Sequence, residues 1–214
     1  MARTRRNPMP GAPTRKVFFD MDTQVDFMKR GGLLYVPEAE DIVQRITDLI
    51  DFAKDTGIMV ISTKDTHAPN DPEFSTFPFQ PHCIPGTPGW EKIDGTLIPD
   101  HIELPVDWSQ PLPDDILEHP QIVVQTNTHD PFASFVLHEI VEKLDKPRCI
   151  VFGVAMDYAV KYVSLGLLQR KCRVAVILNA TRPLREADGR DAIEELKAKG
   201  AEFITTAEVI RVTV

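Results

Sequence analysis

Short apolar runs, separated by segments with helical periodicity, constrain the fold of this chain more than any other feature. The runs are rich in β-branched residues and contain few charges, which is typical of strands buried on both faces of a sheet. They lie at residues 17–19, 58–61, 122–124, 150–154 and 174–178. Because strands that alternate with helices are joined by right-handed crossovers, the pattern predicts a three-layer, doubly wound α/β fold with a mainly parallel β-sheet flanked by helices.

The segments between these runs predict helices, and two of them carry terminal signals. Apolar residues on one face indicate a helix over about 42–53, and Gly57 is a typical stop signal. Asp130 followed by Pro131 suits the first turn of a helix that would continue to about Leu144. Further helices are expected over 157–170 and 189–199, before a short strand at 203–205.

The segment 64–113 has neither a strand period nor a helix period, and it contains many of the prolines. A stretch of this length without regular structure is usually functional or disordered. Because His67, Phe79, His82 and Trp90 lie within it, we predict an ordered loop region that folds over a site.

Composition limits the classes of protein to consider. The chain has 214 residues, of which 43% are hydrophobic, enough for a core without disulfide bonds, and its three cysteines form no CxxC pair. We predict one domain over residues 16–214, preceded by a disordered basic tail over residues 1–15. The net charge of −8 disfavours nucleic acid and anionic membranes as partners. Since no apolar stretch suits a signal peptide or a membrane span, a cytoplasmic protein is expected.

Acidic and imidazole side chains follow the second predicted strand. Asp65 and His67 come directly after it, and Glu73 and His82 lie downstream. In an open α/β sheet, ligands bind beyond the carboxyl ends of the strands, so these side chains could share one ion. Such nitrogen and oxygen ligands suit zinc, iron or manganese better than calcium. Taken alone, an Asp-x-His pair is more often a turn cap beside a surface imidazole.

Three separated motifs favour the metal-site interpretation of these side chains over the turn-cap interpretation. The first is Asp22-Thr23-Gln24-Val25-Asp26-Phe27, which Gly31-Gly32 and Val36-Pro37 follow; the second runs from Asp65 through His82-Cys83 to Gly89; the third is Gly153–Val160. Together they resemble the nicotinamidase/isochorismatase-like cysteine hydrolases, and the nicotinamidases most closely. The resemblance extends from about Val17 to the C-terminus.

The resemblance implies an isochorismatase-like hydrolase fold and a set of site residues. Family members hydrolyse amides with a cysteine, an aspartate and a lysine, and many hold a metal that binds a pyridine nitrogen. The aspartate corresponds to Asp22 and the oxyanion-hole amides to Ala155 and Ala159, with a cis peptide before Ala155.

The implied metal ligands are Asp65, His67, Glu73 and His82, and the implied pocket residues are Phe27, Phe79 and Tyr158. The implied cofactor is a divalent metal, zinc first with iron or manganese as alternatives. The implied partners are a planar heterocyclic amide or acid and further copies of the chain in a dimer or tetramer.

Two catalytic positions depart from the family pattern. The cysteine position holds Ala159, which has no group that can attack a carbonyl, and the lysine position holds Gln125, which cannot supply a cation. The thioester route is therefore closed. Asp20 is an additional carboxylate, which we interpret equally as a strand-edge acid or as a member of the site. His129 follows the strand that bears Gln125, so it could contact a ligand.

Four functional hypotheses follow, and we place a small-molecule-binding pseudoenzyme that retains the pocket and metal first. The second is an active metal-dependent amidohydrolase that uses metal-bound hydroxide with Asp22 as base. The third is an ordinary enzyme with an introduced Cys-to-Ala change, which Gln125 argues against. The fourth is a partner-binding protein with a vestigial cleft, which gives no chemical reason to retain two histidines and two acids.

Overall fold

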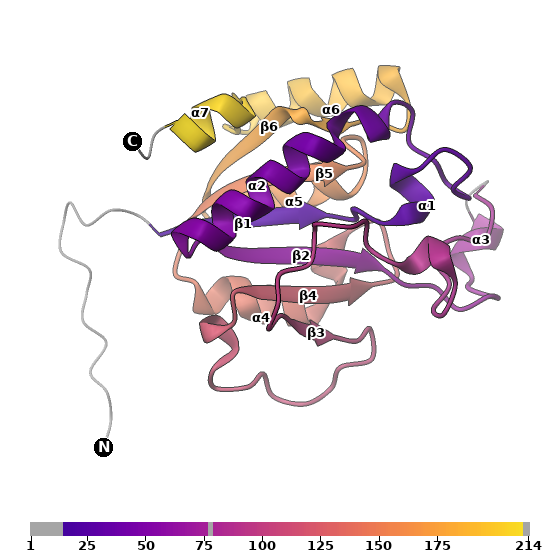
Figure 1. Ribbon diagram of the computed structural model, residues 1–214, viewed down its shortest axis with the longest axis horizontal. Helices are drawn as coiled ribbons and strands as arrows, with labels where there is room; N and C mark the ends of the chain where they lie inside the picture. The colour runs from indigo at the N-terminus through magenta and orange to yellow at the C-terminus, as the bar shows by residue number, and fades with distance from the viewer. Residues whose placement is uncertain (1–14, 77–78, 212–214) are drawn as a thin grey trace.

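The protein is described by a computed structural model that covers residues 15–76 and 79–211. Its central sheet has seven strands, all parallel, in the order β3-β4-β2-β1-β5-β6-β7 (Figure 1). The strands are β1 (Lys16–Met21), β2 (Met59–Asp65), β3 (Ile102–Leu104), β4 (Gln121–Thr126), β5 (Arg148–Val154), β6 (Arg173–Arg182) and β7 (Glu202–Ile204). The doubly wound parallel α/β fold predicted from the sequence is confirmed.

Helices cover both faces of the sheet, so the core has two halves. Along β1, Val17 and Phe19 pack on the side of α4, α5 and α6, whereas Phe18 packs on the side of α1, α2 and α7. This alternation follows from the two-residue period of a strand. The helices are α1 (Val25–Met28), α2 (Val43–Thr56), α3 (Glu73–Thr76), α4 (Phe135–Lys143), α5 (Ala159–Gln169), α6 (Glu186–Ala198) and α7 (Thr206–Ile210).

The observed end of α2 agrees with the predicted stop signal, whereas the observed start of α4 does not agree with the prediction. Gly57 ends α2 with a φ of 67°, a left-handed conformation that a glycine adopts without strain. The predicted helix start at Asp130 is wrong. The Asp130 side chain does accept a hydrogen bond from the Phe132 amide, but it caps a 3-10 turn at Pro131–Ala133. Ser134 then adopts an extended conformation, and α4 begins at Phe135.

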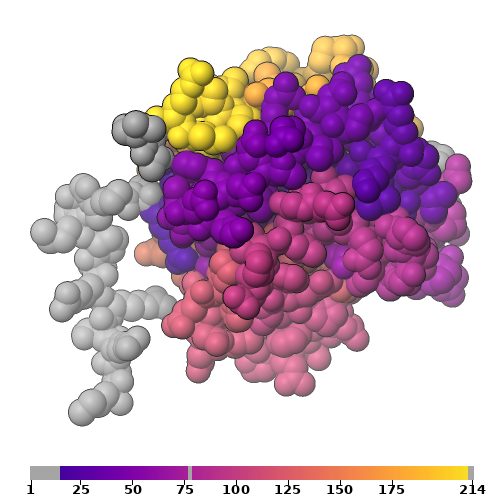
Figure 2. All heavy atoms as spheres, viewed as in Figure 1, coloured from indigo at the N-terminus to yellow at the C-terminus, as the bar shows by residue number. Residues whose placement is uncertain are grey.

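The long segment after the second predicted strand is ordered over the described residues. Its first two residues still belong to β2, and Ile102–Leu104 adds the edge strand β3, which is too short to leave a sequence signal. In the space-filling view, the magenta and pink residues of this segment form a continuous surface below the violet α2 (Figure 2). The predicted basic tail falls almost wholly outside the described residues. Among the described helices, none has the length and apolar character needed to cross a bilayer.

Candidate metal-binding pocket

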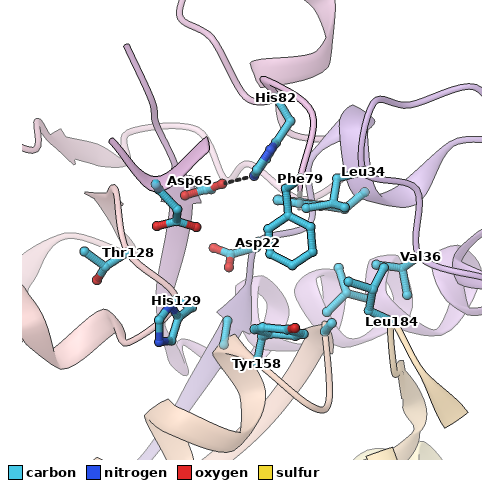
Figure 3. Close-up of a pocket in the computed structure, with 15 residues that line it drawn as sticks. Asp22, Leu34, Val36, Asp65, Phe79, His82, Thr128, His129, Tyr158 and Leu184 are labelled. Carbon is cyan, nitrogen blue, oxygen red and sulfur yellow. Dashed lines mark ion pairs between the residues drawn. The ribbon is translucent and has the colours of Figure 1, made fainter. Parts of the chain in front are cut away.

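A pocket opens at the carboxyl ends of the strands, where polar side chains from several segments meet. Asp22 follows β1, Asp65 ends β2, and the third motif runs from the end of β5 into the start of α5. Figure 3 shows Asp22, Asp65 and His82 on one side of this pocket, with Tyr158 and Leu184 across from them. The topology of a parallel sheet explains this convergence, because all of its strands end at the same edge.

Asp65, His67 and His82 form a buried cluster with the chemistry of a metal site. Their ligand atoms lie within 4.8 Å of one another. The His67 Nε2 atom lies 3.0 Å from Asp65 Oδ1, and the His82 Nε2 atom lies 3.2 Å from Asp65 Oδ2. The opposite ring nitrogens have other neighbours: His67 Nδ1 lies 3.1 Å from Asp71 Oδ2, and His82 Nδ1 lies 2.8 Å from the Gln80 carbonyl. Such outer contacts fix the orientation of metal-ligating imidazoles.

The charges of the cluster stabilise one another. Burial alone would lower the pKa of His67, but hydrogen bonds to Asp65 and Asp71 and the charge of Asp65 raise it to about 9. Burial likewise opposes ionisation of Asp65, yet its hydrogen bonds with His67 and His82 lower its pKa. The cluster thus contains an ionised carboxylate and two imidazoles that turn their Nε2 atoms toward it. This set of donors fits a divalent metal such as zinc.

Glu73, the fourth ligand implied by the resemblance, is placed differently. It begins α3 and lines the pocket, but its ligand atoms are not part of the convergent group of three. Burial raises the pKa of its carboxyl group, and the nearby charge of His67 opposes that rise. Its role as a ligand stays a prediction.

Asp22 lies deep in the pocket in an unusual electrostatic setting. Its φ of 47° turns the chain out of β1. Its amide donates to the Thr63 hydroxyl at 3.1 Å, and that hydroxyl in turn contacts the Asp22 carboxyl group. Burial and the charge of Asp65 raise the pKa of Asp22 to about 7. A carboxyl group with such a pKa can take up or release a proton near neutrality.

The start of α5 forms the floor of the pocket, and the cis peptide expected before Ala155 is present. Ala159 is the first residue of α5 and is 3% exposed. Asp157 fixes the position of the wall residue Leu184, because its carboxylate accepts hydrogen bonds from the amides of Leu184 and Arg185 at 2.8 and 3.0 Å. The pocket lining drawn from the described residues contains no cysteine.

Aromatic and aliphatic side chains form the remaining walls. The three residues expected there, Phe27, Phe79 and Tyr158, all line the pocket. His129 also lines it, with its ring centroid 6.3 Å from that of Tyr158. The sequence reasoning missed several apolar and polar wall residues, namely Leu34, Val36, Thr128, Val154 and Leu184. Val154 ends β5 and the other four lie in connections between elements. Val36 and Val154 belong to motifs quoted above, but nothing in the sequence alone marks any of the five as a wall of the pocket.

Gln125 points away from the pocket. Its Nε2 atom donates to Glu103 Oε1 at 2.6 Å, and the same oxygen lies 3.3 Å from Lys64 Nζ. Lys64 is the neighbour of Gln125 across the β2–β4 ladder, and its Nζ atom lies 3.2 Å from the centroid of the Trp90 ring. Gln125 is therefore part of a polar cluster at the edge of the sheet.

Asp20, the additional carboxylate, forms a buried ion pair with Lys92. Their side chains are 0% exposed, and Lys92 Nζ lies 2.9 Å from Asp20 Oδ2. Thr23 and Ser62 also donate hydrogen bonds to this carboxylate. Since Lys92 belongs to the long segment after β2, the pair anchors that segment to the sheet. Of the two interpretations of Asp20, the structure favours a structural one.

Comparisons with known proteins agree with these observations. The chain matches the family model of the isochorismatase domain over residues 17–208. It is 30% identical to the nicotinamidase of Escherichia coli (strain K12) over 208 residues, which cover 88% of this chain and 93% of that relative. The resemblance inferred from the three sequence motifs is confirmed.

Solved structures share the fold. The pyrazinamidase of Pyrococcus horikoshii in complex with zinc has a TM-score of 0.72 and 24% identity, covering 89% of this chain and 99% of that one. A protein of L. infantum in complex with nicotinate has a TM-score of 0.71 and 20% identity, covering 91% of this chain and 94% of that one. At these identities, the likeness supports the architecture alone.

Proposed function

Because this chain belongs to the isochorismatase family, we propose that it binds a divalent metal and a flat heteroaromatic acid or amide without covalent catalysis. The observation that carries this proposal is Ala159 on the floor of the pocket, at the first residue of α5. An alanine cannot attack a carbonyl. Without a nucleophile, only residual catalysis from binding and backbone donors is expected, roughly a millionfold below a complete covalent apparatus.

Cys83 does not replace the missing nucleophile. It is 0% exposed, and its backbone amide donates to Asp26 at 2.8 Å. Burial, together with the charges of Asp65 and Asp26, raises the pKa of its thiol well above the ordinary value. A thiol that stays protonated is a poor nucleophile.

The pocket suits a ligand that is flat, largely apolar and polar at one edge. Phe27, Phe79 and Tyr158 provide aromatic surface, and Leu34 and Leu184 provide aliphatic surface. Aromatic side chains bind planar rings well. A metal held by Asp65, His67 and His82 would supply a Lewis acid for a ring nitrogen or a carbonyl oxygen. Zinc is the first candidate, with iron or manganese as alternatives.

A metal-dependent hydrolase is the second candidate function, and the pKa of Asp22 favours it. A carboxyl group with a pKa of about 7 is suited to act as a general base near neutral pH. This candidate requires hydrolysis that depends on the metal, whereas the first requires binding without hydrolysis.

The experiment measures metal content, ligand affinity and hydrolysis on the full-length chain. The protein is purified without added metal, and its metals are quantified. Binding of nicotinamide and nicotinate is then measured by calorimetry, and ammonia release from nicotinamide is followed with and without a chelator. Ala159→Cys is tested, with Ala159→Ser as a control of similar size.

The outcomes separate the two candidates. Bound metal, measurable ligand affinity and no ammonia from the wild type support the proposal, more so if a variant with Ala159→Cys gains activity that Ala159→Ser lacks. Ammonia release that the chelator abolishes would favour the hydrolase. Ammonia release that the chelator does not affect, or a chain that binds neither ligand nor metal, would overturn both.

A further inference from the structure

The central glutamine of the first sequence motif has no role in the pocket, yet it contacts a candidate metal ligand directly. Gln24 is 0% exposed. Its Nε2 atom donates to the Asp65 carbonyl at 2.8 Å, and its Oε1 atom accepts from the Asp65 amide at 2.7 Å. The second Nε2 hydrogen reaches the Trp90 carbonyl, with a donor–acceptor distance of 2.9 Å. Both polar atoms of this side chain are therefore engaged, and two of the bonds hold one residue.

The sheet topology explains why Asp65 needs this contact. The β1–β2 ladder ends at the pair Asp20↔Ser62, while on the other side of β2 the ladder with β4 continues to Asp65↔Thr126. The Thr66 amide still donates to the Thr126 carbonyl at 2.7 Å. In a parallel sheet, the amide and carbonyl of one residue point to the same side of the strand. Those of Asp65 point to the side that β1 has left.

A buried backbone amide and carbonyl without partners would be costly. The Gln24 side-chain amide fills the gap as a peptide group of a neighbouring strand would, since it offers one acceptor and one donor. Trp90 supports the next residue, because its indole nitrogen donates to the Thr66 hydroxyl at 2.9 Å. The backbone of Asp65 is thus held by Gln24 on the side of β1, and the side chain of Thr66 is held by Trp90.

From this geometry we propose that Gln24 is a positioning residue for the metal site and acts through the backbone of Asp65. The inference rests on the metal site of the proposed function. Asp65 is the member of the cluster that contacts both histidines, so a shift of its backbone would disturb all three ligands. Loss of an outer support of this kind typically lowers metal affinity about 10- to 100-fold.

A second buried glutamine provides a matched control. Gln121 is also 0% exposed and also makes three hydrogen bonds, to the Ser62 hydroxyl, the Thr96 carbonyl and the Ile98 amide. None of these partners belongs to the cluster of Asp65, His67 and His82. Gln24→Met and Gln121→Met therefore remove similar numbers of buried hydrogen bonds, but only the first removes them from a candidate metal ligand.

The test measures the zinc affinity of the full-length wild type and both variants by competition with a chromophoric chelator, and their melting temperatures without metal. We expect Gln24→Met to bind zinc about 10- to 100-fold more weakly, and Gln121→Met to lose melting temperature with an affinity within about twofold of the wild type. Unchanged affinity in Gln24→Met, or an equal loss in Gln121→Met, would overturn the inference. If Gln24→Met does not fold, Gln24→Asn replaces it, since the shorter amide cannot span both groups of Asp65, and the same criteria apply.

Hydrogen exchange distinguishes failure of this inference from failure of the proposed function. A wild type that binds no zinc contradicts the proposed metal site, and the exchange rate of the Asp65 amide in the metal-free protein then decides the positioning role. We expect this amide to be protected in the wild type and in Gln121→Met and to exchange faster in Gln24→Met. Equal protection in all three proteins would overturn the inference.

Discussion

Asp22 holds an ionisable group in a place where burial favours its neutral form. Its pKa rises from an ordinary value of 3.8 to about 7, so between these pH values the folded protein binds a proton that the unfolded chain has released. Stability contributed by this group is therefore lost as the pH rises from about 4 to about 7. An asparagine at this position keeps a hydrogen-bond acceptor for Thr63 and removes the ionisation.

We therefore expect Asp22→Asn to be more stable than the wild type at about pH 8, and to show little or no gain at about pH 4. Urea unfolding in the presence of a chelator measures both differences. Asp55→Asn, which changes an exposed carboxylate on α2, is the control. A stability difference of the same size at both pH values would contradict the assignment of a raised pKa to Asp22.

Gly153 is a residue whose missing Cβ atom matters. It lies near the end of β5 with a φ of 105°, and a Cβ atom there would lie 2.2 Å from the Met21 carbonyl oxygen. Gly200 has a similar φ of 95°, but a Cβ atom at that residue would have nothing within 4 Å. The two glycines thus separate backbone strain from steric conflict.

Gly200→Ala should lose about 1–2 kcal/mol of unfolding free energy through backbone strain alone. Gly153→Ala should lose at least about twice as much, because β5 must also move away from β1. Chemical denaturation of the two variants provides the comparison. Equal losses would mean that the chain relieves the contact with Met21 at no cost.

At the scale of elements, the buried pair of Asp20 and Lys92 connects the long segment after β2 to β1. Removing one partner leaves a buried charge uncompensated, so Lys92→Met should cost about 3–5 kcal/mol of stability. The double variant Asp20→Asn with Lys92→Met leaves no charge behind and should lose less than the single variant. Urea unfolding of both proteins tests this order. A double variant that is less stable than Lys92→Met would show that the hydrogen bonds from Thr23 and Ser62 are enough to stabilise the Asp20 carboxylate without Lys92.

The sequence predicted the elements that have strong local signals and missed those set by tertiary contacts. β1, β2, β4, β5 and β6 contain apolar runs that any buried parallel strand requires, and Gly57 ends α2 because a left-handed residue is needed there. The start of α4 could not be found in this way. Asp130 and Pro131 satisfy the local rules for a helix start, yet the chain uses them for a separate turn and begins the helix after Ser134.

At the scale of the whole molecule, the candidate site likewise contains residues that the sequence predicted and residues whose placement depends on tertiary contacts. Asp65, His67 and His82 could be named in advance because side chains after parallel strands meet at one edge of the sheet, and because three motifs resemble one family. The sequence did not predict that Gln125 bonds to Glu103 or that Asp20 pairs with Lys92. Both depend on which side chains of the segment after β2 reach the sheet, and contacts between distant segments determine that.

A metal in this pocket would connect the end of β2 to the segment that carries His82, so it should stabilise the whole molecule. A ligand that binds only the folded state at about 100 times its dissociation constant adds about 2.7 kcal/mol to the free energy of unfolding. We expect zinc to raise the melting temperature of the wild type and a chelator to reverse the rise. His82→Gln should lose most of this effect, because one of the three convergent ligands is gone.

His101→Gln is the matched control, since His101 is an imidazole outside the pocket whose Nδ1 atom lies 2.9 Å from the Ile98 carbonyl oxygen. It should keep the full response to zinc. An equal response in all three proteins would mean that zinc acts at some other position, and no response in the wild type would exclude zinc as the metal of this site. A response lost only in His82→Gln would tie the stability of the fold to the same three side chains that the proposed function requires.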